Sequence, residues 1–291
     1  DELAADAQAP GAGALLDAVA AALDGHGCPG GPPPIWITET GTDPAAGADG
    51  CRAMAQALAA WRDDPRVQAA FQYTFREDTA FPVGLADAGL TTIEATSFVH
   101  PKWVPQLADA DELLADLPRR PGVRYPVLVP NERGLDRALA RGVTDIAIFG
   151  SATESFARRN LNRTLDSQFN MFAPVVEREL AHGLRVRAYL SMVFADPWEG
   201  PTPPEQVVRI GRRLLDLGCY ELSLGDTIGV GTPGHVERLL DAFAEAGVGM
   251  DRLAVHFHDT YGQALANTLT ALRRGVTVVD ASAGGIGGCP Y

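Results

Sequence analysis

The sequence is poor in cysteine and has no long apolar run. Its four cysteines, Cys28, Cys51, Cys219 and Cys289, form no CxxC pair and show no spacing typical of a disulfide framework. This argues against a disulfide-stapled secreted domain and favours a reducing cytoplasm. No apolar stretch is long enough to cross a bilayer, and no basic segment precedes an apolar core. The sequence therefore predicts neither a membrane span nor a secretory signal.

Basic residues are also few relative to acidic ones. The chain has 24 Lys and Arg against 37 Asp and Glu, a net charge of −13. Binding to nucleic acid or an anionic membrane needs clustered positive charge, so we expect neither as a partner. An anionic substrate would need a local basic patch or helix N-termini. Arg158, Arg159 and Arg163 are candidates for such a patch, and a solvated helix face is the alternative.

From residue 91 onward, strand patterns alternate with amphipathic helical patterns. The 291 residues suffice for one barrel-sized domain. Seven strands are expected, in TTIEATSF, RYPVLVP, DIAIFGS, RVRAYLSMVF, YELSLGDT, LAVHFHD and VTVVDAS. Helices are expected between them at residues 134–140, 168–181, 204–217, 233–246 and 263–274. Such alternation predicts parallel β/α units.

The segment from Leu253 to Tyr291 has features of a catalytic centre. His256 and His258 lie two residues apart at the end of an expected strand, so both imidazoles point to one face and can share a metal ion. A glycine-rich loop then leads to Cys289. Parallel α/β folds keep their chemistry at these strand ends. On spacing alone, a structural His-x-His pair and an ordinary loop cysteine remain alternatives.

Six motifs within residues 85–291 point to one family. They are AGLTTIEATSFVHPKWVPQLADA, VLVPNERGLDRAL, FGSATESFARRNLN, LSLGDTIGVGTPG, HFHDTYGQALANTL and VVDASAGGIGGCPY. Together they resemble the 3-hydroxy-3-methylglutaryl-CoA lyases, which are metal-dependent TIM barrels. The resemblance implies an acyl-CoA substrate, cleaved to acetoacetate and acetyl-CoA by a retro-Claisen reaction. It also implies Mg²⁺ or Mn²⁺, bound in the family by two His, one Asp and one Asn.

The resemblance assigns roles to individual residues. His256 and His258 match the metal-binding histidines, and Cys289 matches an acid/base on a mobile glycine loop. Asp226 matches an active-site carboxylate that exchanges a proton or orients His256, with a helix N-cap as the alternative. Glu94 matches a carboxylate that orients the arginine of the metal site. Substrate-lining positions are matched by Tyr189, Ser151 and Glu154.

Residues 33–85 resemble a different protein. PPIWITETG, a helix and FQYTFREDTAFPVGL are similar to the last two strand units of a cellulase-like glycoside hydrolase barrel, in which Glu39 matches the nucleophile. A retaining glycosidase needs a second carboxyl group about 5–5.5 Å away, and the sequence before Glu39 shows no segment that supplies it. We expect three parts: a flexible, helical segment (1–34), a glycosidase-like segment that supplies the first barrel strand (35–84), and a lyase-like barrel (85–291).

The expected fold is therefore α/β, a TIM-type (β/α)8 barrel that is incomplete or chimeric, with a flexible N-terminus and a missing last helix. Without that helix, the outer faces of Val276 and Val278 would be uncovered, which predicts a homodimer or aggregation.

Two family features are absent from the sequence. The family's first strand carries an Arg-Asp pair, for which Arg76 and Asp78 are the nearest substitutes, with Asp78 as the candidate third metal ligand. The family's Asn ligand lies just beyond the GGCPY loop. These departures leave three alternatives open: a catalytically inactive fusion scaffold, a related acyl-CoA condensing synthase, and a glycoside hydrolase.

Overall fold

The computed structural model describes residues 35–37, 67–70, 85–87, 89–102 and 104–282, which fall into two compact units. The first unit includes β1 (Ile35–Ile37) and β2 (Val67–Ala70), which pair in parallel. The second unit comprises the described residues of 94–116 and 124–280. It contains the large sheet and the candidate site, and the description below concerns this unit unless stated otherwise.

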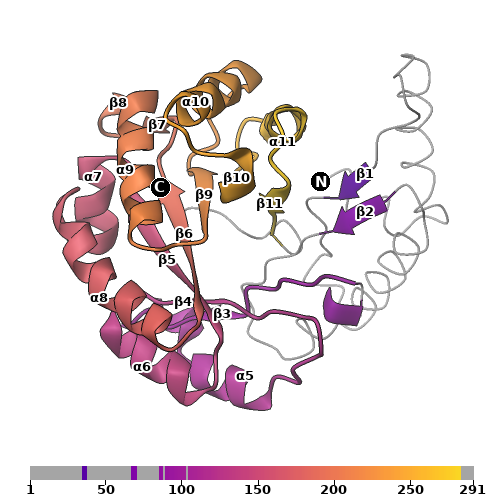
Figure 1. The fold of residues 1–291 in the computed structure, drawn as a ribbon, viewed down its shortest axis with the longest axis vertical. Coiled ribbons are helices and arrows are strands. Elements are labelled where there is room, and N and C mark those ends of the chain that lie inside the picture. Colours follow the sequence, from indigo (N-terminus) through magenta and orange to yellow (C-terminus); the bar gives the residue numbers. More distant parts are fainter. Residues whose placement is uncertain (1–34, 38–66, 71–84, 88, 103, 283–291) are drawn as a thin grey trace. The chain divides into compact units, whose positions relative to one another are not determined.

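The large sheet has seven parallel strands. In spatial order they are β3 (Thr96–Ser97), β4 (Val127–Leu128), β5 (Asp145–Ser151), β6 (Arg185–Ser191), β9 (Glu221–Asp226), β10 (Leu253–Phe257) and β11 (Val278–Asp280). Each lies in a segment where a strand was expected. The sheet curls as a TIM-type barrel does, and β3 and β11 are its edges within the described residues (Figure 1).

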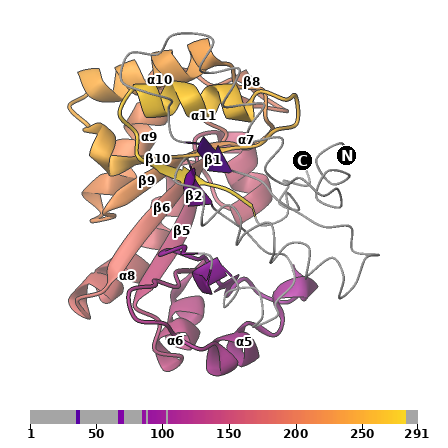
Figure 2. The same cartoon turned by 90° about the vertical axis from the view of Figure 1, so that its right-hand side faces the viewer.

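Helices follow the strands and lie outside the sheet (Figures 1 and 2). The longer ones are α5 (Ala110–Asp116), α6 (Glu132–Ala140), α8 (Ser167–Ala181), α9 (Pro204–Asp216), α10 (Pro233–Glu245) and α11 (Ala264–Arg273). Short turns are η2 (Pro105–Leu107), α7 (Glu154–Phe156), the π-helical η3 (Ala157–Leu161) and η4 (Met250–Arg252). The five expected helices are all present, whereas α5, the π-helical turn and the hairpin β7 (Ala195–Asp196)–β8 (Gly200–Pro201) were not predicted.

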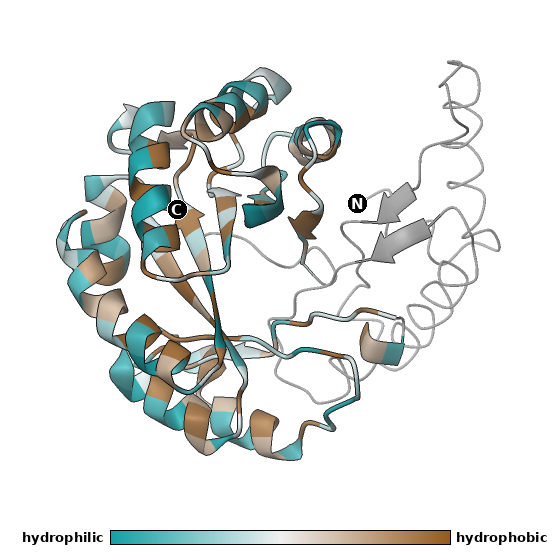
Figure 3. Ribbon diagram, viewed as in Figure 1, coloured by the Kyte–Doolittle hydropathy of each residue, from teal (hydrophilic) through white to brown (hydrophobic). Residues whose placement is uncertain are grey.

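The apolar core lies between the sheet and these helices, where the brown residues of Figure 3 gather. Strand residues such as Leu222 and Leu224 are buried, as are Ile210 and Phe243 on the covering helices. Gly211 lets α9 approach β9, because a Cβ at this position would lie 2.6 Å from Leu222 Cδ2. One face of the strands is thus sealed by close packing, which leaves the other face for polar side chains.

One expectation about the last strand is wrong. Val276 is 1% exposed, and Val278 is half-buried and lies on the same side of β11 as Asp280. The two valines therefore do not form an uncovered outer face, and the homodimer inferred from them stays a prediction. The expected strand at residues 67–75 is described only as β2, and residues 1–34, 71–84 and the glycine loop lie outside the described residues.

No helix within the described ranges is long and apolar enough to span a membrane.

Candidate active site

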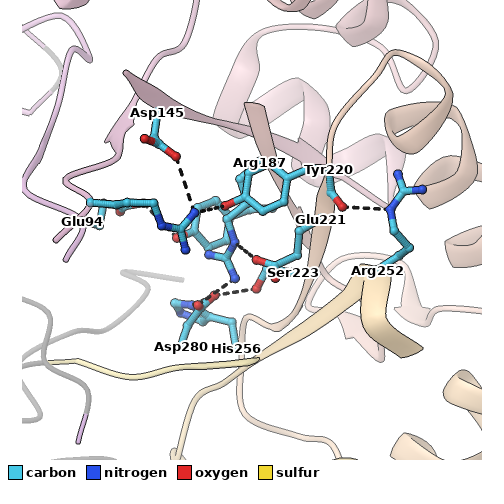
Figure 4. Close-up of polar contacts among 11 residues, drawn as sticks. Glu94, Asp145, Arg187, Tyr220, Glu221, Ser223, Arg252, His256 and Asp280 are labelled. Carbon is cyan, nitrogen blue, oxygen red and sulfur yellow. Dashed lines mark hydrogen bonds and ion pairs between the residues drawn. The ribbon is translucent and has the colours of Figure 1, made fainter. Parts of the chain in front are cut away.

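Polar side chains meet on the inner face of the sheet because they alternate along neighbouring strands. Arg187 and Tyr189 lie two residues apart on β6, so they share a face. Strand register places Arg187 opposite Glu221 of β9, and His256 of β10 opposite Asp280 of β11. Figure 4 shows the side chains of Arg187, Glu221, Ser223, His256 and Asp280 converging. We call Glu94, Arg187, Tyr189, Glu221, Ser223, His256 and Asp280 the inner cluster.

Arg187 is the buried cation of the inner cluster. Its Nε donates to Glu221 Oε1 at 2.5 Å and its Nη2 donates to Asp280 Oδ1 at 2.8 Å, with only 9% of the side chain exposed. Burial by itself would lower the pKa of Arg187, but Asp280, Tyr189 and Glu221 together outweigh it and raise that pKa well above its usual value. A buried charge is tolerated only with such partners. Arg187 therefore joins three strands through permanent ion pairs.

Asp280 uses both carboxylate oxygens. Oδ1 accepts from Arg187, and Oδ2 accepts a 2.6 Å hydrogen bond from Ser223 Oγ and lies 3.5 Å from His256 Nδ1. Burial alone would raise the pKa of Asp280, but the Arg187 guanidinium and His256 hold it well below the usual range. Asp280 is thus an ionised carboxylate, fixed by donors on two sides.

Glu94 is paired with a hydroxyl group. Tyr189 Oη donates to Glu94 Oε2 at 2.8 Å. Burial raises the pKa of Glu94 from 4.5 to about 7, although the Tyr189 hydrogen bond and the Arg187 charge oppose the rise. A carboxyl group with a pKa near 7 can both take up and release a proton at neutral pH. The candidate for the arginine that Glu94 was expected to orient, Arg76, lies outside the described residues, so this role of Glu94 stays a prediction.

The two histidines lie side by side, with ring centres 5.3 Å apart and planes inclined by 38°. Burial, together with the neighbouring His256, lowers the pKa of His258 to about 4, so this ring is neutral at pH 7. Nδ1 of His256 is buried and makes no hydrogen bond to any described residue. The edge of the His256 ring meets Tyr189, with ring centres 6.0 Å apart.

The donor set suits part of a metal site. Neutral imidazoles are nitrogen ligands for divalent cations, whereas Mg²⁺ also requires oxygen ligands. In the part of the chain that the structure describes, no group of three or more His, Cys, Asp or Glu could hold a metal ion. The two histidines therefore fit two positions of a cation's coordination shell. The expected third ligand, Asp78, and the expected acid/base, Cys289, lie outside the described residues.

Asp226 holds a loop together. Its Oδ1 accepts from Val230 N at 3.1 Å and its Oδ2 from Gly231 N at 2.8 Å. Burial raises the pKa of Asp226, and these backbone N–H groups partly offset the rise. Asp226 is not the N-cap of α10, because Thr232 and His235 form the capping box of that helix. The N-cap alternative for Asp226 is therefore wrong.

The expectation that Asp226 orients His256 is also wrong. Asp226 pairs with Phe257 in the sheet register, whereas His256 pairs with Gly225, so the two side chains leave their strands on opposite faces. The carboxylate beside His256 is that of Asp280. A role for Asp226 in proton exchange stays a prediction.

Ser151 and Glu154 shape the turn after β5. Ser151 is fully buried, and its Oγ donates to Thr153 O at 2.9 Å and accepts from Thr153 N at 3.0 Å. Glu154 Oε2 accepts from Leu165 N at 2.6 Å, while its Oε1 pairs with Arg158 at 2.7 Å. These contacts account for both residues as turn-forming groups, and a substrate-lining role stays a prediction.

The three arginines of the expected basic patch differ in their surroundings. Arg158 pairs with Glu154, and the Arg159 guanidinium lies 4.2 Å from the centre of the Trp198 ring. Arg163 lines an open cavity of about 290 Å³ together with Asn170. Arg163 is thus the arginine of the patch that lines this cavity, and phosphate binding there stays a prediction.

Sequence reasoning missed Arg187, Ser223 and Asp280 as members of the site. A signal was present in the strand RVRAYLS, where an arginine sits inside a segment otherwise suited to burial. Such a residue needs a buried partner. Its partner lies 93 residues further along the chain, and local periodicity carries no information about that pairing.

Comparisons with known proteins place the chain in a family. A family model described as HMGL-like matches residues 66–289. The bovine mitochondrial hydroxymethylglutaryl-CoA lyase is 51% identical over 207 residues, which are 71% of this chain and 63% of that protein. A Pseudomonas aeruginosa protein named 3-hydroxy-3-isohexenylglutaryl-CoA/hydroxy-methylglutaryl-CoA lyase is 50% identical, over 71% of this chain and 69% of its own length. The HMG-CoA lyase structure from Brucella melitensis superposes with a TM-score of 0.72 at 46% identity, covering 75% of this chain and 77% of that one.

These matches also bear on the N-terminal part of the chain. The family model starts at residue 66, inside the segment that was thought to resemble a glycoside hydrolase, and the glycosidase resemblance is not supported. The chain spans just under two thirds of the length of the mammalian relative. Since the family model covers most of the chain and relatives reach half identity, this chain belongs to the HMGL-like family.

Proposed function

We propose that this protein is a carbon–carbon lyase that cleaves 3-hydroxy-3-methylglutaryl-CoA to acetoacetate and acetyl-CoA with a divalent metal ion. The names of relatives that are 51% and 50% identical support this reaction. The observation that carries it is a pair of adjacent imidazoles at the end of β10, those of His256 and His258, of which His256 belongs to the inner cluster together with Glu94, a carboxyl group of raised pKa. TIM barrels keep their active sites at this end of the strands.

The reaction needs a base, a way to acidify an alcohol, and an acid. A base takes the proton of the tertiary hydroxyl, the C–C bond breaks, and its electron pair forms the enolate of acetyl-CoA, which is then protonated. A bound divalent cation would supply the acidity of the hydroxyl. His256 and His258 would hold that cation through ring nitrogens, and Asp78 is the candidate oxygen ligand.

The chain's own groups can manage the protons. Glu94 exchanges a proton near neutral pH, and the Tyr189 hydroxyl is hydrogen-bonded to it at 2.8 Å. Arg187 is committed to Glu221 and Asp280, so its role is to hold the inner cluster in shape. Cys289 is the candidate acid for the departing enolate, as the family resemblance implies.

Several further assignments belong to this proposal. Residues 85–291 would form the lyase part, after segments 1–34 and 35–84. A rat relative, 48% identical, is named cytoplasmic, and we propose that location, although the bovine relative is named mitochondrial. The Pseudomonas relative's name includes an isohexenyl substrate, so the group at C3 of the substrate distinguishes two candidate esters.

The test is the release of acetoacetate from 3-hydroxy-3-methylglutaryl-CoA with Mg²⁺ or Mn²⁺, using the wild type, His258→Ala and the control His182→Ala. His182 is exposed on α8 and bonds its own helix through Arg178 O. We expect metal-dependent cleavage that falls at least about 100-fold in His258→Ala, in line with the loss of a metal ligand, and is unchanged in His182→Ala. A folded wild-type chain that releases no acetoacetate with either metal would contradict the proposal. Cleavage of only the isohexenyl ester would change the substrate.

A further inference from the structure

We infer that Asp280 is a positioning residue that fixes the tautomer of His256, with the proton on Nδ1 and the lone pair on Nε2 available to a metal ion. The purpose of this arrangement depends on the function proposed above, but the tautomer can be measured without a substrate or a metal. The roles taken over from the family resemblance do not include Asp280.

The first argument is the position of the two ring nitrogens. Nδ1 of His256 is buried against Asp280, whose Oδ2 lies 3.5 Å away, whereas the side chain as a whole is 36% exposed. The exposed part of the ring is therefore not Nδ1. An ion that approaches from solvent meets the side of the ring that carries Nε2, and it needs a lone pair there.

The second argument is that Asp280 can only accept. Its Oδ1 is ion-paired with Arg187 and its Oδ2 accepts from Ser223, so both oxygens already act as acceptors in this structure. The 3.5 Å separation is longer than an ordinary hydrogen bond, yet the nearest charge to Nδ1 is negative. A proton on Nδ1 is attracted by that charge, and a lone pair there is repelled.

The third argument is that Asp280 has little freedom to turn away. Arg187 Nη2 holds Oδ1 at 2.8 Å and Ser223 Oγ holds Oδ2 at 2.6 Å, from two different strands. The carboxylate plane is thus set by β6 and β9, while His256 stands on β10. Carboxylate groups that orient a metal-binding histidine act in this way, and their loss weakens metal binding about 10- to 100-fold.

The effect of Asp280→Asn can be predicted because Arg187 has only hydrogen-bond donors. The new carboxamide must place its oxygen toward Arg187, where Oδ1 now lies. Its NH₂ group then takes the place of Oδ2, beside Ser223 and His256. An NH₂ donor facing Nδ1 requires a lone pair on Nδ1, so the proton moves to Nε2. The substitution should invert the tautomer while keeping the shape of the side chain.

The measurement is the ¹⁵N NMR spectrum of histidine-labelled, metal-free protein near pH 8. The chain has six histidines, and the signals of His256 are assigned from their loss in His256→Gln. We expect a pyrrole-like Nδ1 and a pyridine-like Nε2 in the wild type, and the reverse in Asp280→Asn. Asp145→Asn is the matched control, because Asp145 is a buried strand carboxylate that faces Arg124 and Thr144. Mn²⁺ titration should show the 10- to 100-fold loss only in Asp280→Asn.

The wild-type spectrum decides the matter even if Asp280→Asn fails to fold. A wild-type His256 with its proton on Nε2 would overturn the inference. So would a folded Asp280→Asn protein with the wild-type tautomer, or one that binds Mn²⁺ as tightly as the wild type. A wild-type chain with the expected tautomer that does not cleave 3-hydroxy-3-methylglutaryl-CoA would disprove the proposed function and leave the role of Asp280 intact.

Discussion

The inner cluster and the N-terminal ends of the same strands use charged residues in different ways. At the N-terminal ends, Arg252 donates to the backbone carbonyls of Tyr220 and Cys219, and Asp145 faces the partly exposed Arg124. In the inner cluster, Arg187 and Asp280 bond to side chains and to no backbone group among the described residues. Charged groups that bond to the backbone, such as Arg252, stabilise the fold. Charged groups that bond to other side chains set the surroundings of the site residues, here His256 and Glu94.

The largest effect should come from removing the buried cation. Arg187→Met leaves Glu221 and Asp280 as buried carboxylates without their partner, and we expect a loss of about 3–5 kcal/mol in the free energy of unfolding. Urea titration at pH 7 measures it. The matched change at the N-terminal ends of the strands is Arg252→Met, which removes an exposed side chain bonded to backbone carbonyl oxygens. It should lower the free energy of unfolding by about 1 kcal/mol. Equal losses in the two variants would contradict the comparison.

Near the N-terminal ends of the strands, one carboxyl group is poorly satisfied, that of Glu179 on α8. It is fully buried, and neither carboxylate oxygen has a hydrogen-bond partner among the described residues. Burial raises its pKa from 4.5 to about 7; the neighbouring His182 opposes the rise and Asp145 adds to it. Between pH 4.5 and about 7, the Glu179 carboxyl group is therefore protonated in the folded state and ionised in the unfolded state. Stability should fall as the pH rises through that window, and then level off.

Glu179→Gln should remove this loss. We expect the variant to be about 1–3 kcal/mol more stable than the wild type at pH 8, with little difference at pH 4.5. Urea titrations at the two pH values check it. The control is Glu177→Gln, an exposed position on the same helix, where the difference should not depend on pH. A Glu179→Gln protein whose gain is the same at both pH values would show that the carboxyl group is not protonated in the fold.

The smallest expected effect concerns the hydroxyl group on Glu94. Tyr189→Phe leaves the half-buried Glu94 without its donor, and we expect a loss of about 1–2 kcal/mol in stability, measured by thermal unfolding. Tyr220→Phe is the counterpart at the N-terminal end, where the hydroxyl lies 3.4 Å from Arg124 Nη1 at the long limit of a hydrogen bond. A larger loss in Tyr220→Phe than in Tyr189→Phe would reverse the comparison.

The sequence predicted the strands and helices of the second unit because period and composition are local. Every expected strand from residue 91 onward contains an observed one, and the five expected helices begin and end within two residues of the observed bounds. The His256–His258 pair could be predicted for the same reason, since alternation along one strand decides which residues share a face.

Contacts across the sheet could not be predicted in this way. Asp226 and Asp280 both end a strand, and only the sheet register shows that Asp280 faces His256 while Asp226 faces the loop at 229–231. The role of Glu94 depends on Tyr189, which is 95 residues distant. The π-helical turn 157–161 has no periodic signal that separates it from an ordinary helix.

The same long separations bear on how the protein folds. The Arg187–Asp280 and Tyr189–Glu94 contacts join residues 93 and 95 positions apart, so each closes a long loop whose entropy is lost before any contact is gained. We therefore expect both to form late, after the local strand–helix pairs. A chain emerging from the ribosome has no inner cluster until residue 280 is free, so the surroundings of His256 and Glu94 are completed only at the end of folding.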